Sequence, residues 1–378
     1  MKTTQKSRSV GPTLLSAAVL SLALLGDVLI YVILPVNAEL FGVTIFWVGV
    51  LLAANRLIRI FAYGAIAAFA ERIGPRNLAI ISAIAASLST LAYGLTTGWP
   101  ILLIARITWG LCFASLTLVV FAYAVEDRSK AGTRVGFSRS VQQICPSAVL
   151  LLGPLGAIAI GPTEIFIILG LISTVAIPVA LLLPKEGRKP KPKKTQWLPT
   201  PNRFDWFMFI AGFTVDGVFA MAITLSIAEV SSINSAMIAG GVILGIRRGS
   251  EALLAPLGGF LGDKYGTNLL LFWSTLITAV GFAFLAYGFL YVGGLLAVLG
   301  RSFIAALWPA EIALRNTEET ALRRIAIGQT WRDIGAAGGP LIAGSLIATV
   351  SLDLIYWSMS LLVVSGLWLQ RRQTKWVA

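Results

Sequence analysis

The chain contains no histidine, only two cysteines and few charged residues for its length. Asp, Glu, Lys and Arg make up 12% of its 378 residues, whereas a soluble domain carries about 25%. Cys112 and Cys145 both lie within apolar stretches, which argues against a disulfide framework. The sequence offers no metal-ligand spacing and no nucleophile beside a base, which argues against an enzyme and predicts no metal and no cofactor.

Long apolar stretches are abundant instead, and 57% of the residues are hydrophobic. The stretch from Pro12 to Pro35 is interrupted by a single charge, Asp27. About 20 mostly apolar residues cross a hydrocarbon core of ~30 Å. These stretches do not alternate in polarity, and lipid offers no hydrogen-bond partners, so each is expected to be a helix and not a barrel strand. The sequence therefore predicts an all-α polytopic protein of the lipid bilayer.

Hydropathy predicts about twelve transmembrane helices. The first six are expected at 12–36, 43–69, 77–97, 99–124, 136–160 and 164–183. The second six are expected at 205–229, 235–260, 268–290, 294–315, 325–350 and 352–370. We therefore predict an N-terminal six-helix bundle over 1–183, a basic, proline-rich cytoplasmic linker over 184–204, and a C-terminal six-helix bundle over 205–378.

Basic residues recur in every second connection between these helices. They include Arg72, Arg76, Arg128, Lys130, Arg134, Lys264, Arg315, Arg323 and Arg324. The other connections contain no Lys or Arg, only acidic residues such as Glu39 and Asp353. Because positive loops stay on the cytoplasmic side, both termini are predicted to be cytoplasmic, with the protein in the inner membrane. This bias accounts for the net charge of +13 without a nucleic-acid partner.

The two halves repeat similar residues in corresponding helices, which indicates an internal duplication. The end of helix 2 carries Gly64, Glu71, Arg72, Gly74 and Arg76, and the end of helix 8 carries Asp263, Lys264 and Gly266. Other pairs lie roughly 190 residues apart: Asp27 with Asp216, Arg106 with Arg301, and the cluster Asn55, Arg56 and Arg59 with Arg247, Arg248 and Glu251. We expect two pseudo-symmetric bundles.

With these motifs the sequence resembles a major facilitator superfamily transporter over essentially its whole length. The segment from Glu71 to Arg76 resembles the family's loop between helices 2 and 3, Gly-x-x-x-Asp-Arg-x-Gly-Arg-Arg. It departs by having Glu for Asp and Gly-Pro-Arg for Gly-Arg-Arg. Arg106-x-x-x-Gly110 resembles the helix 4 motif that the family links to proton coupling. The resemblance implies a secondary active transporter that works by alternating access.

Glycine and proline clusters in helices 5 and 11 bear on the direction of transport. Gly335-x-x-x-Gly339-Pro340 in helix 11 resembles the glycine–proline motif of antiporters, but in antiporters this motif lies in helix 5. Helix 5 has only Gly153-Pro154, without the preceding glycine. Both clusters are expected to allow close packing and helix bending. Proton-coupled export of a small organic molecule is the expected activity, and proton-coupled uptake is the alternative.

Charged side chains inside apolar spans are expected to face a partner or a cavity. Insertion scales give a cost of about 2.5 to 3.5 kcal/mol for Arg or Asp at a helix centre. Asp27 and Arg106 lie at similar depth and are predicted to form a pair that protonation or substrate releases. The alternative is a permanent ion pair between helices. Without histidine, a proton relay has to use carboxylates, and the candidates are Asp27, Asp216, Glu251 and Asp333.

Arginine outnumbers acidic residues within the spans. The predicted substrate cavity contains Gln142 and the arginines Arg56, Arg59, Arg247, Arg248, Arg301 and Arg332. Guanidinium groups bind carboxylate and phosphate in bidentate fashion, which favours an anionic substrate. Against this, Arg139 and Arg332 are placed near cytoplasmic helix ends, where they could simply snorkel, and Arg332 could also pair with acids of adjacent helices. Efflux of a lipophilic cation, held by the carboxylates, is the alternative.

The charges at the cytoplasmic rim are interpreted as a gate that pairs the halves in the outward-facing state. The predicted gate consists of Gly64, Glu71, Arg72, Gly74, Arg76, Asp263, Lys264 and Gly266. The alternative is that these charges only set orientation. A channel fits the doubled repeat less well than alternating access does, and only a flux assay would separate a transporter from a receptor of the same fold. We expect a monomer that binds a small molecule and uses a proton gradient.

Overall fold

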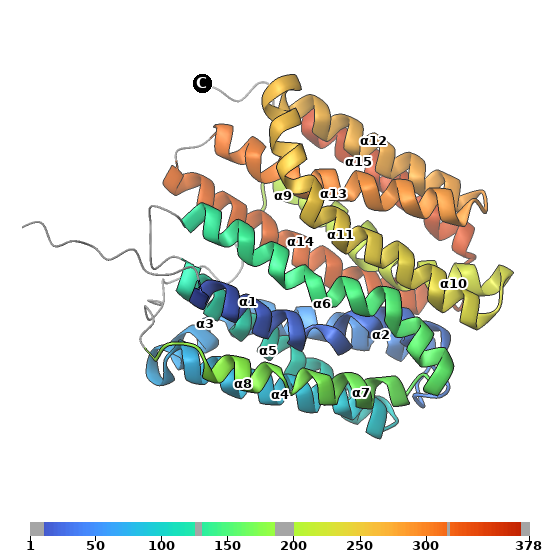
Figure 1. Cartoon of the computed structure of the whole chain (residues 1–378). Helices are drawn as coiled ribbons and strands as arrows, with labels where there is room; N and C mark the ends of the chain where they lie inside the picture. The colour runs from blue at the N-terminus through green and yellow to red at the C-terminus, as the bar shows by residue number, and fades with distance from the viewer. Residues whose placement is uncertain (1–10, 125–130, 186–199, 316–317, 372–378) are drawn as a thin grey trace, which may run out of the picture.

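The computed structural model describes residues 11–124, 131–185, 200–315 and 318–371, and within these ranges every regular element is a helix (Figure 1). Ten helices or runs of two or three consecutive helices among them are long and apolar enough to cross a membrane. Two further helices are as long but carry more of the interior charges. The prediction of an all-α membrane protein with about twelve transmembrane helices is therefore confirmed.

The first six spans are built from eight helices. They are α1 (Gly11–Ala23), α2 (Leu25–Val36), α3 (Ile45–Ile73), α4 (Pro75–Leu95), α5 (Trp99–Ala124), α6 (Ala131–Ile160), α7 (Glu164–Ser173) and α8 (Ala176–Leu181). α1 and α2 form one span that is interrupted at Leu24, and α7 and α8 form another that is interrupted at Thr174 and Val175. The remaining four spans are uninterrupted helices.

The next six spans begin with an unusual helix. Its segments are α9 (Arg203–Ala211), the π-helical η2 (Gly212–Phe219) and α10 (Ala220–Val230). The other spans are α11 (Ile233–Tyr265), α12 (Thr267–Ala286), α13 (Leu290–Arg315), α14 (Glu318–Leu346) and α15 (Leu352–Arg371). Side chains of Asn202 and Asp205 form a capping box that starts α9.

Several helices extend beyond their predicted bounds, three of them clearly at ends that carry charges. α3 continues to Ile73, α11 continues to Tyr265, and α14 begins at Glu318 instead of 325. The predicted bounds end where charged residues interrupt the apolar stretch. Because Glu, Lys and Arg are good helix formers, the helix itself continues through them. α3 and α11 end only at Gly74 and Gly266, whose φ angles of 83° and 87° suit glycine.

The outer surface is apolar. Large side chains such as Leu88, Leu152 and Leu361 are 60%, 65% and 66% exposed. A soluble protein rarely exposes apolar surface on this scale. Lipid is the medium in which these side chains are stable, and the interior is left for the charged groups.

The helices form two groups in space, one from α1 to α8 and one from α9 to α15 (Figure 1). Between them, α3 lies against α14, α6 against α11, and α2 against α10. The start of α1 and the end of α8 lie at one end of the molecule (Figure 1). We call the opposite end, where residues 37–44, 161–163, 231–232 and 347–351 connect helices, the far end.

The two groups touch through glycines toward the far end. A Cβ atom added to Gly49 of α3 would overlap the carbonyl oxygen of Pro340 in α14, and one added to Gly241 of α11 would overlap the carbonyl oxygen of Leu150 in α6. At the same end Nδ2 of Asn37 lies 3.4 Å from Sδ of Met237. The structure is therefore closed at the far end.

Gly49→Ala is expected to lower the thermal unfolding midpoint, because the new methyl group would push α3 away from α14. Gly249→Ala is a matched control, since nothing lies within 4 Å of a Cβ atom added there. Alanine is the better helix former by about 1 kcal/mol, so the control should be as stable as the wild type or more stable. Thermal unfolding in detergent compares the two variants. Equal midpoints would show that the approach of α3 to α14 is not close-packed.

Candidate functional site

Asp27 lies in the first turn of α2, just after the interruption of the first span. Its Oδ1 accepts hydrogen bonds from Nη1 of Arg106 at 2.5 Å and from Nδ2 of Asn55 at 2.9 Å. Arg106 is fully buried, and its Nε donates to the carbonyl oxygen of Leu51 at 2.9 Å. The structure thus brings together Asp27 and Arg106, as the sequence predicts, and adds Asn55 from a third span.

Tyr31 connects this ion pair to the boundary between the two groups of helices. Its hydroxyl donates to the carbonyl oxygen of Leu52 at 3.2 Å, which holds the ring against α3. The guanidinium carbon of Arg106 lies 5.6 Å from the ring centroid, and that of Arg56 lies 5.7 Å from it. Both distances are within the range of cation–π attraction. One ring therefore contacts the cation of the ion pair and a cation at the boundary.

Asp216 occupies the matching place in the second half but is held by more cations. Its Oδ1 accepts from Arg247 at 2.5 Å, and its Oδ2 accepts from Arg301 at 2.7 Å. Nε of Arg332 lies 3.8 Å from the same Oδ2. The carboxylate side chain is 4% exposed and lies in the π-helical segment η2. Both oxygens of Asp216 are thus occupied by guanidinium groups, whereas Asp27 accepts from one.

The other two candidate carboxylates pair with arginines of their own helices. Oε1 of Glu251 lies 3.5 Å from Nε of Arg247, one turn away on α11. Oδ1 of Asp333 accepts from the adjacent Arg332 at 2.8 Å. Both side chains are about a quarter exposed or less. Through these two arginines, Glu251 and Asp333 belong to the same network as Asp216.

Arg332 differs from its predicted placement at a helix end. Because α14 begins at Glu318, Arg332 lies near the middle of the helix. There it contacts Asp216 and Asp333 instead of snorkelling toward the membrane surface. The placement at a helix end was wrong because the charged first turns of α14 were assigned to a loop, whereas the alternative, pairing with an acid of an adjacent helix, is what the structure shows. Arg139 also lies well inside its helix, α6, and its side chain is exposed.

Four arginines of the spans have no carboxylate partner among the described residues: Arg56, Arg59, Arg139 and Arg248. Nη1 of Arg56 donates to two carbonyl oxygens. Nε of Arg59 donates to the carbonyl oxygen of Asn55 at 3.0 Å, and its guanidinium carbon lies 4.5 Å from the centroid of the Phe113 ring. The hydrogen bonds of Arg56 and Arg59 therefore go to neutral carbonyl oxygens and not to carboxylates.

Three residues that contact the predicted site were not assigned to it from the sequence: Asn55, Tyr31 and Gln143. Gln143, and not the predicted Gln142, accepts from Nη1 of Arg248 at 3.4 Å. Neighbouring glutamines lie about 100° apart around a helix, so their order alone could not tell which one faces the partner. Asn55 carried a signal, since it stands beside Arg56 in the repeated cluster. Tyr31 carried a weaker one, its place one turn after Asp27.

The predicted gate residues make no contact between the halves among the side chains that the structure describes. Nη2 of Arg76 donates to the carbonyl oxygen of Leu181 at 2.6 Å, within the first half. Nζ of Lys264 lies 5.2 Å from the ring of the adjacent Tyr265. Glu71 is half-buried and Arg72 is exposed. The surroundings of Gly64 and the side chain of Asp263 lie outside the described residues. A gate at this end stays a prediction, to be tested in the opposite state.

The glycine–proline clusters serve close packing. α6 runs through Gly153 and Pro154 without interruption, and α14 runs through Pro340. A Cβ atom on Gly339 would overlap Gly217 of η2, and one on Gly335 would overlap the carbonyl oxygen of Phe209 in α9. The interruptions of helical structure lie elsewhere, in the first, sixth and seventh spans.

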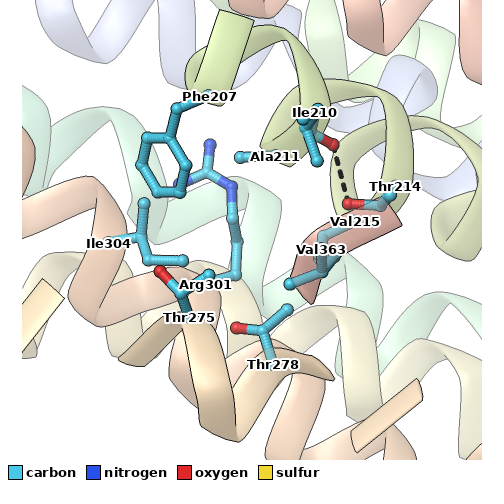
Figure 2. Close-up of a pocket in the computed structure, with 10 residues that line it drawn as sticks. All are labelled: Phe207, Ile210, Ala211, Thr214, Val215, Thr275, Thr278, Arg301, Ile304 and Val363. Atoms are coloured by element: carbon cyan, nitrogen blue, oxygen red, sulfur yellow. Dashed lines mark hydrogen bonds between the residues drawn. The ribbon is translucent and has the colours of Figure 1, made fainter. Parts of the chain in front are cut away.

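A small cavity lies beside Arg301, and every residue that lines it belongs to the second half (Figure 2). Its lining residues are Phe207, Ile210, Ala211, Thr214, Val215, Thr275, Thr278, Arg301, Ile304 and Val363. Its volume of about 10 Å³ is room for a single water-sized molecule. It is too small for an organic substrate. Within the described residues no three Cys, Asp or Glu side chains gather as a metal site would.

Comparison with known proteins places these features in a family. The model of the Major Facilitator Superfamily matches residues 16–247. Two crystal structures of the nucleoside transporter NupG resemble the fold over nearly the whole chain. One of them, of a point mutant, has a TM-score of 0.75 at 13% identity and covers 97% of this chain and 100% of its own. The second structure has a TM-score of 0.73 at 13% identity, with coverages of 98% and 100%.

Proposed function

Because the chain belongs to the major facilitator superfamily, we propose that it is a secondary active transporter of small organic anions, coupled to protons through Asp27. The observation that carries the anionic substrate is the set of buried or half-buried arginines without a carboxylate partner among the described residues: Arg56, Arg59 and Arg248. A guanidinium deep in a membrane protein is costly unless an anion or a dipole compensates it. A bound carboxylate or phosphate would supply that compensation.

Asp27 is the preferred coupling group because it has a single cationic partner. A proton added to Asp27 would remove the charge that Arg106 pairs with, and Arg106 lies against the ring of Tyr31. The same ring contacts Arg56 at the boundary. Protonation of Asp27 can thus affect the contact between the halves through three adjacent side chains, Arg106, Tyr31 and Arg56.

We propose that the two groups of helices, which close at the far end, work by alternating access. We place the termini in the cytoplasm because Arg72, Arg76 and Lys264, basic residues of the connections that the structure describes, lie opposite the far end. The far end is then periplasmic, and the structure represents the state closed to the periplasm. We further propose that one chain, with its twelve spans, is the functional unit. Export of the substrate remains the expected direction of transport, and uptake is the alternative. None of the contacts described above distinguishes between the two.

The substrate class can be tested by thermal stabilisation of the purified protein. A ligand that binds only the folded state at 100 times its Kd stabilises that state by about 2.7 kcal/mol. The panel contains small organic acids, phosphorylated compounds, lipophilic cations and nucleosides, the last because NupG is a nucleoside transporter. Organic acids or phosphorylated compounds are expected to raise the unfolding midpoint.

A variant shows where the anion binds. Arg59→Gln should weaken the stabilisation by the anion, whereas Arg203→Gln, an exposed arginine at the start of α9, should leave it unchanged. Stabilisation by lipophilic cations alone would overturn the anionic substrate. The carboxylates Asp27, Asp216 and Glu251 would then be the expected contacts of a drug exporter.

A further inference from the structure

Arg56 reaches from the first half into the second. Its Nη1 donates to the carbonyl oxygen of Asp216 at 2.9 Å and to that of Ala336 at 2.8 Å. Asp216 lies in the π-helical segment η2, and Ala336 lies in α14. A carbonyl oxygen has two lone pairs, so it can accept from Arg56 in addition to its own helix. Both hydrogens of Nη1 are thereby used to join the halves.

Arg248 makes the corresponding contact in the opposite direction. Its Nη1 reaches from α11 to Oε1 of Gln143 in α6, at 3.4 Å. Arg56 and Arg248 are roughly 190 residues apart and belong to the repeated clusters of the second and eighth spans. Their acceptors Ala336 and Gln143 are separated by a similar interval and belong to the eleventh and fifth spans. The two contacts are thus related by the internal repeat.

The guanidinium of Arg56 also has N–H donors that these contacts do not use. Arginine has five N–H donors, and the bonds to Asp216 and Ala336 leave Nε and Nη2 of Arg56 without a partner among the described residues. These two nitrogens form one edge of the guanidinium plane, which matches the two oxygens of a carboxylate or phosphate. Both side chains are half-buried, so these edges are not sealed in the core.

We propose that Arg56 and Arg248 are a symmetric pair of latches that hold the halves together in this state, and that the free edge of Arg56 binds one carboxylate or phosphate group of the substrate. The second part rests on the proposed function, whereas the latches do not. One residue would then join the halves and hold the substrate at the point where they meet.

The latch can be tested without any ligand by following closure of the far end. Asn37→Cys and Met237→Cys, in a background with Cys112→Ala and Cys145→Ala, place two thiols at a contact between the halves. Arg56→Gln should lower the rate of cross-linking about tenfold, since charge-assisted hydrogen bonds are lost. Arg248→Gln should lower it less, because it loses one longer bond.

Arg59→Gln is the matched control for the latch. Arg59 lies one turn from Arg56 on α3, and its hydrogen bond stays within that helix. Its removal should leave the cross-linking rate unchanged. If Arg56→Gln cross-links like the wild type, or if Arg59→Gln slows the reaction equally, the latch is refuted. Unchanged elution of each variant in size-exclusion chromatography shows that it remains folded.

The anion site has its own readout, the affinity for whichever anion of the ligand panel stabilises the wild type. Arg56→Lys keeps the charge but lacks the planar edge, so both Arg56→Lys and Arg56→Gln should bind that anion at least about tenfold more weakly. An affinity of Arg56→Lys equal to that of the wild type would overturn the bidentate edge. If no anion stabilises the wild type, the anion site falls together with the proposed function, and the cross-linking result still decides the latch.

Discussion

Replacing Asp216 by alanine is expected to lower the free energy of unfolding by about 3 to 5 kcal/mol, because it leaves buried cations without their partner. Arg247 and Arg301 donate directly to the carboxylate, and Arg332 lies within 3.8 Å of it. Arg301 is 1% exposed and has no second acidic partner among the described residues. Glu251 and Asp333 can partly compensate the other two arginines, but neither reaches Arg301.

The loss would appear as a lower unfolding midpoint in detergent and as less folded protein recovered from the membrane. Asp353→Ala is the control, since Asp353 is exposed in the first turn of α15 and its removal leaves no buried charge. Surface substitutions of this kind change stability by about 0.5 kcal/mol or less. Should Asp216→Ala unfold at the same temperature as Asp353→Ala, the three arginines would have to be compensated by something other than this carboxylate.

Asp27→Asn is expected to abolish proton-driven transport while substrate binding is retained. The amide has nearly the shape of the carboxylate, and its oxygen can still accept from Asn55 and Arg106. It cannot take up and release a proton, so a pH gradient no longer drives the cycle. Transport into proteoliposomes under an imposed pH gradient measures the first effect, and thermal stabilisation by the same anion measures the second.

Two further variants serve as comparisons for the transport and binding measurements on Asp27→Asn. Asp353→Asn removes an exposed carboxylate and should transport like the wild type. Arg106→Ala should lose both transport and binding, because it leaves Asp27 unpaired and withdraws the cation beside Tyr31. Equal transport by Asp27→Asn and wild type under the pH gradient would remove Asp27 from the coupling mechanism. Intact activity of Arg106→Ala would reduce Arg106 to a structural role.

The fold followed from the sequence because lipid permits so few backbone structures. Apolar stretches of sufficient length have to be helices, and the prediction failed mainly where charges interrupt hydropathy. The start of α14 is the clearest case, since Glu318 and its neighbours are polar yet helical. The resulting error placed Arg332 at a helix end. The interruption at Leu24 and the π-helical segment around Asp216 left no mark in hydropathy, because their residues are as apolar as the rest of the span.

The charged residues could be identified from the sequence, but the partner of each could not. The repeat correctly singled out Asp27 and Arg106, since both lie at similar depth in neighbouring spans. It also matched Asp216 to Asp27 and Arg301 to Arg106, and the structure joins Asp216 to Arg301 but adds Arg247 and Arg332.

The sequence by itself determined the number of spans, the membrane environment, the duplication and the excess of arginine inside the spans. These are properties of composition and local pattern, and the absence of hydrogen-bonding solvent in lipid converts them directly into helices. Only the tertiary structure decided which arginines form ion pairs with a carboxylate and which donate hydrogen bonds to neutral oxygen atoms. That choice depends on side chains from helices more than a hundred residues apart, such as Arg56 and Ala336, and on the close approach that glycines allow between them.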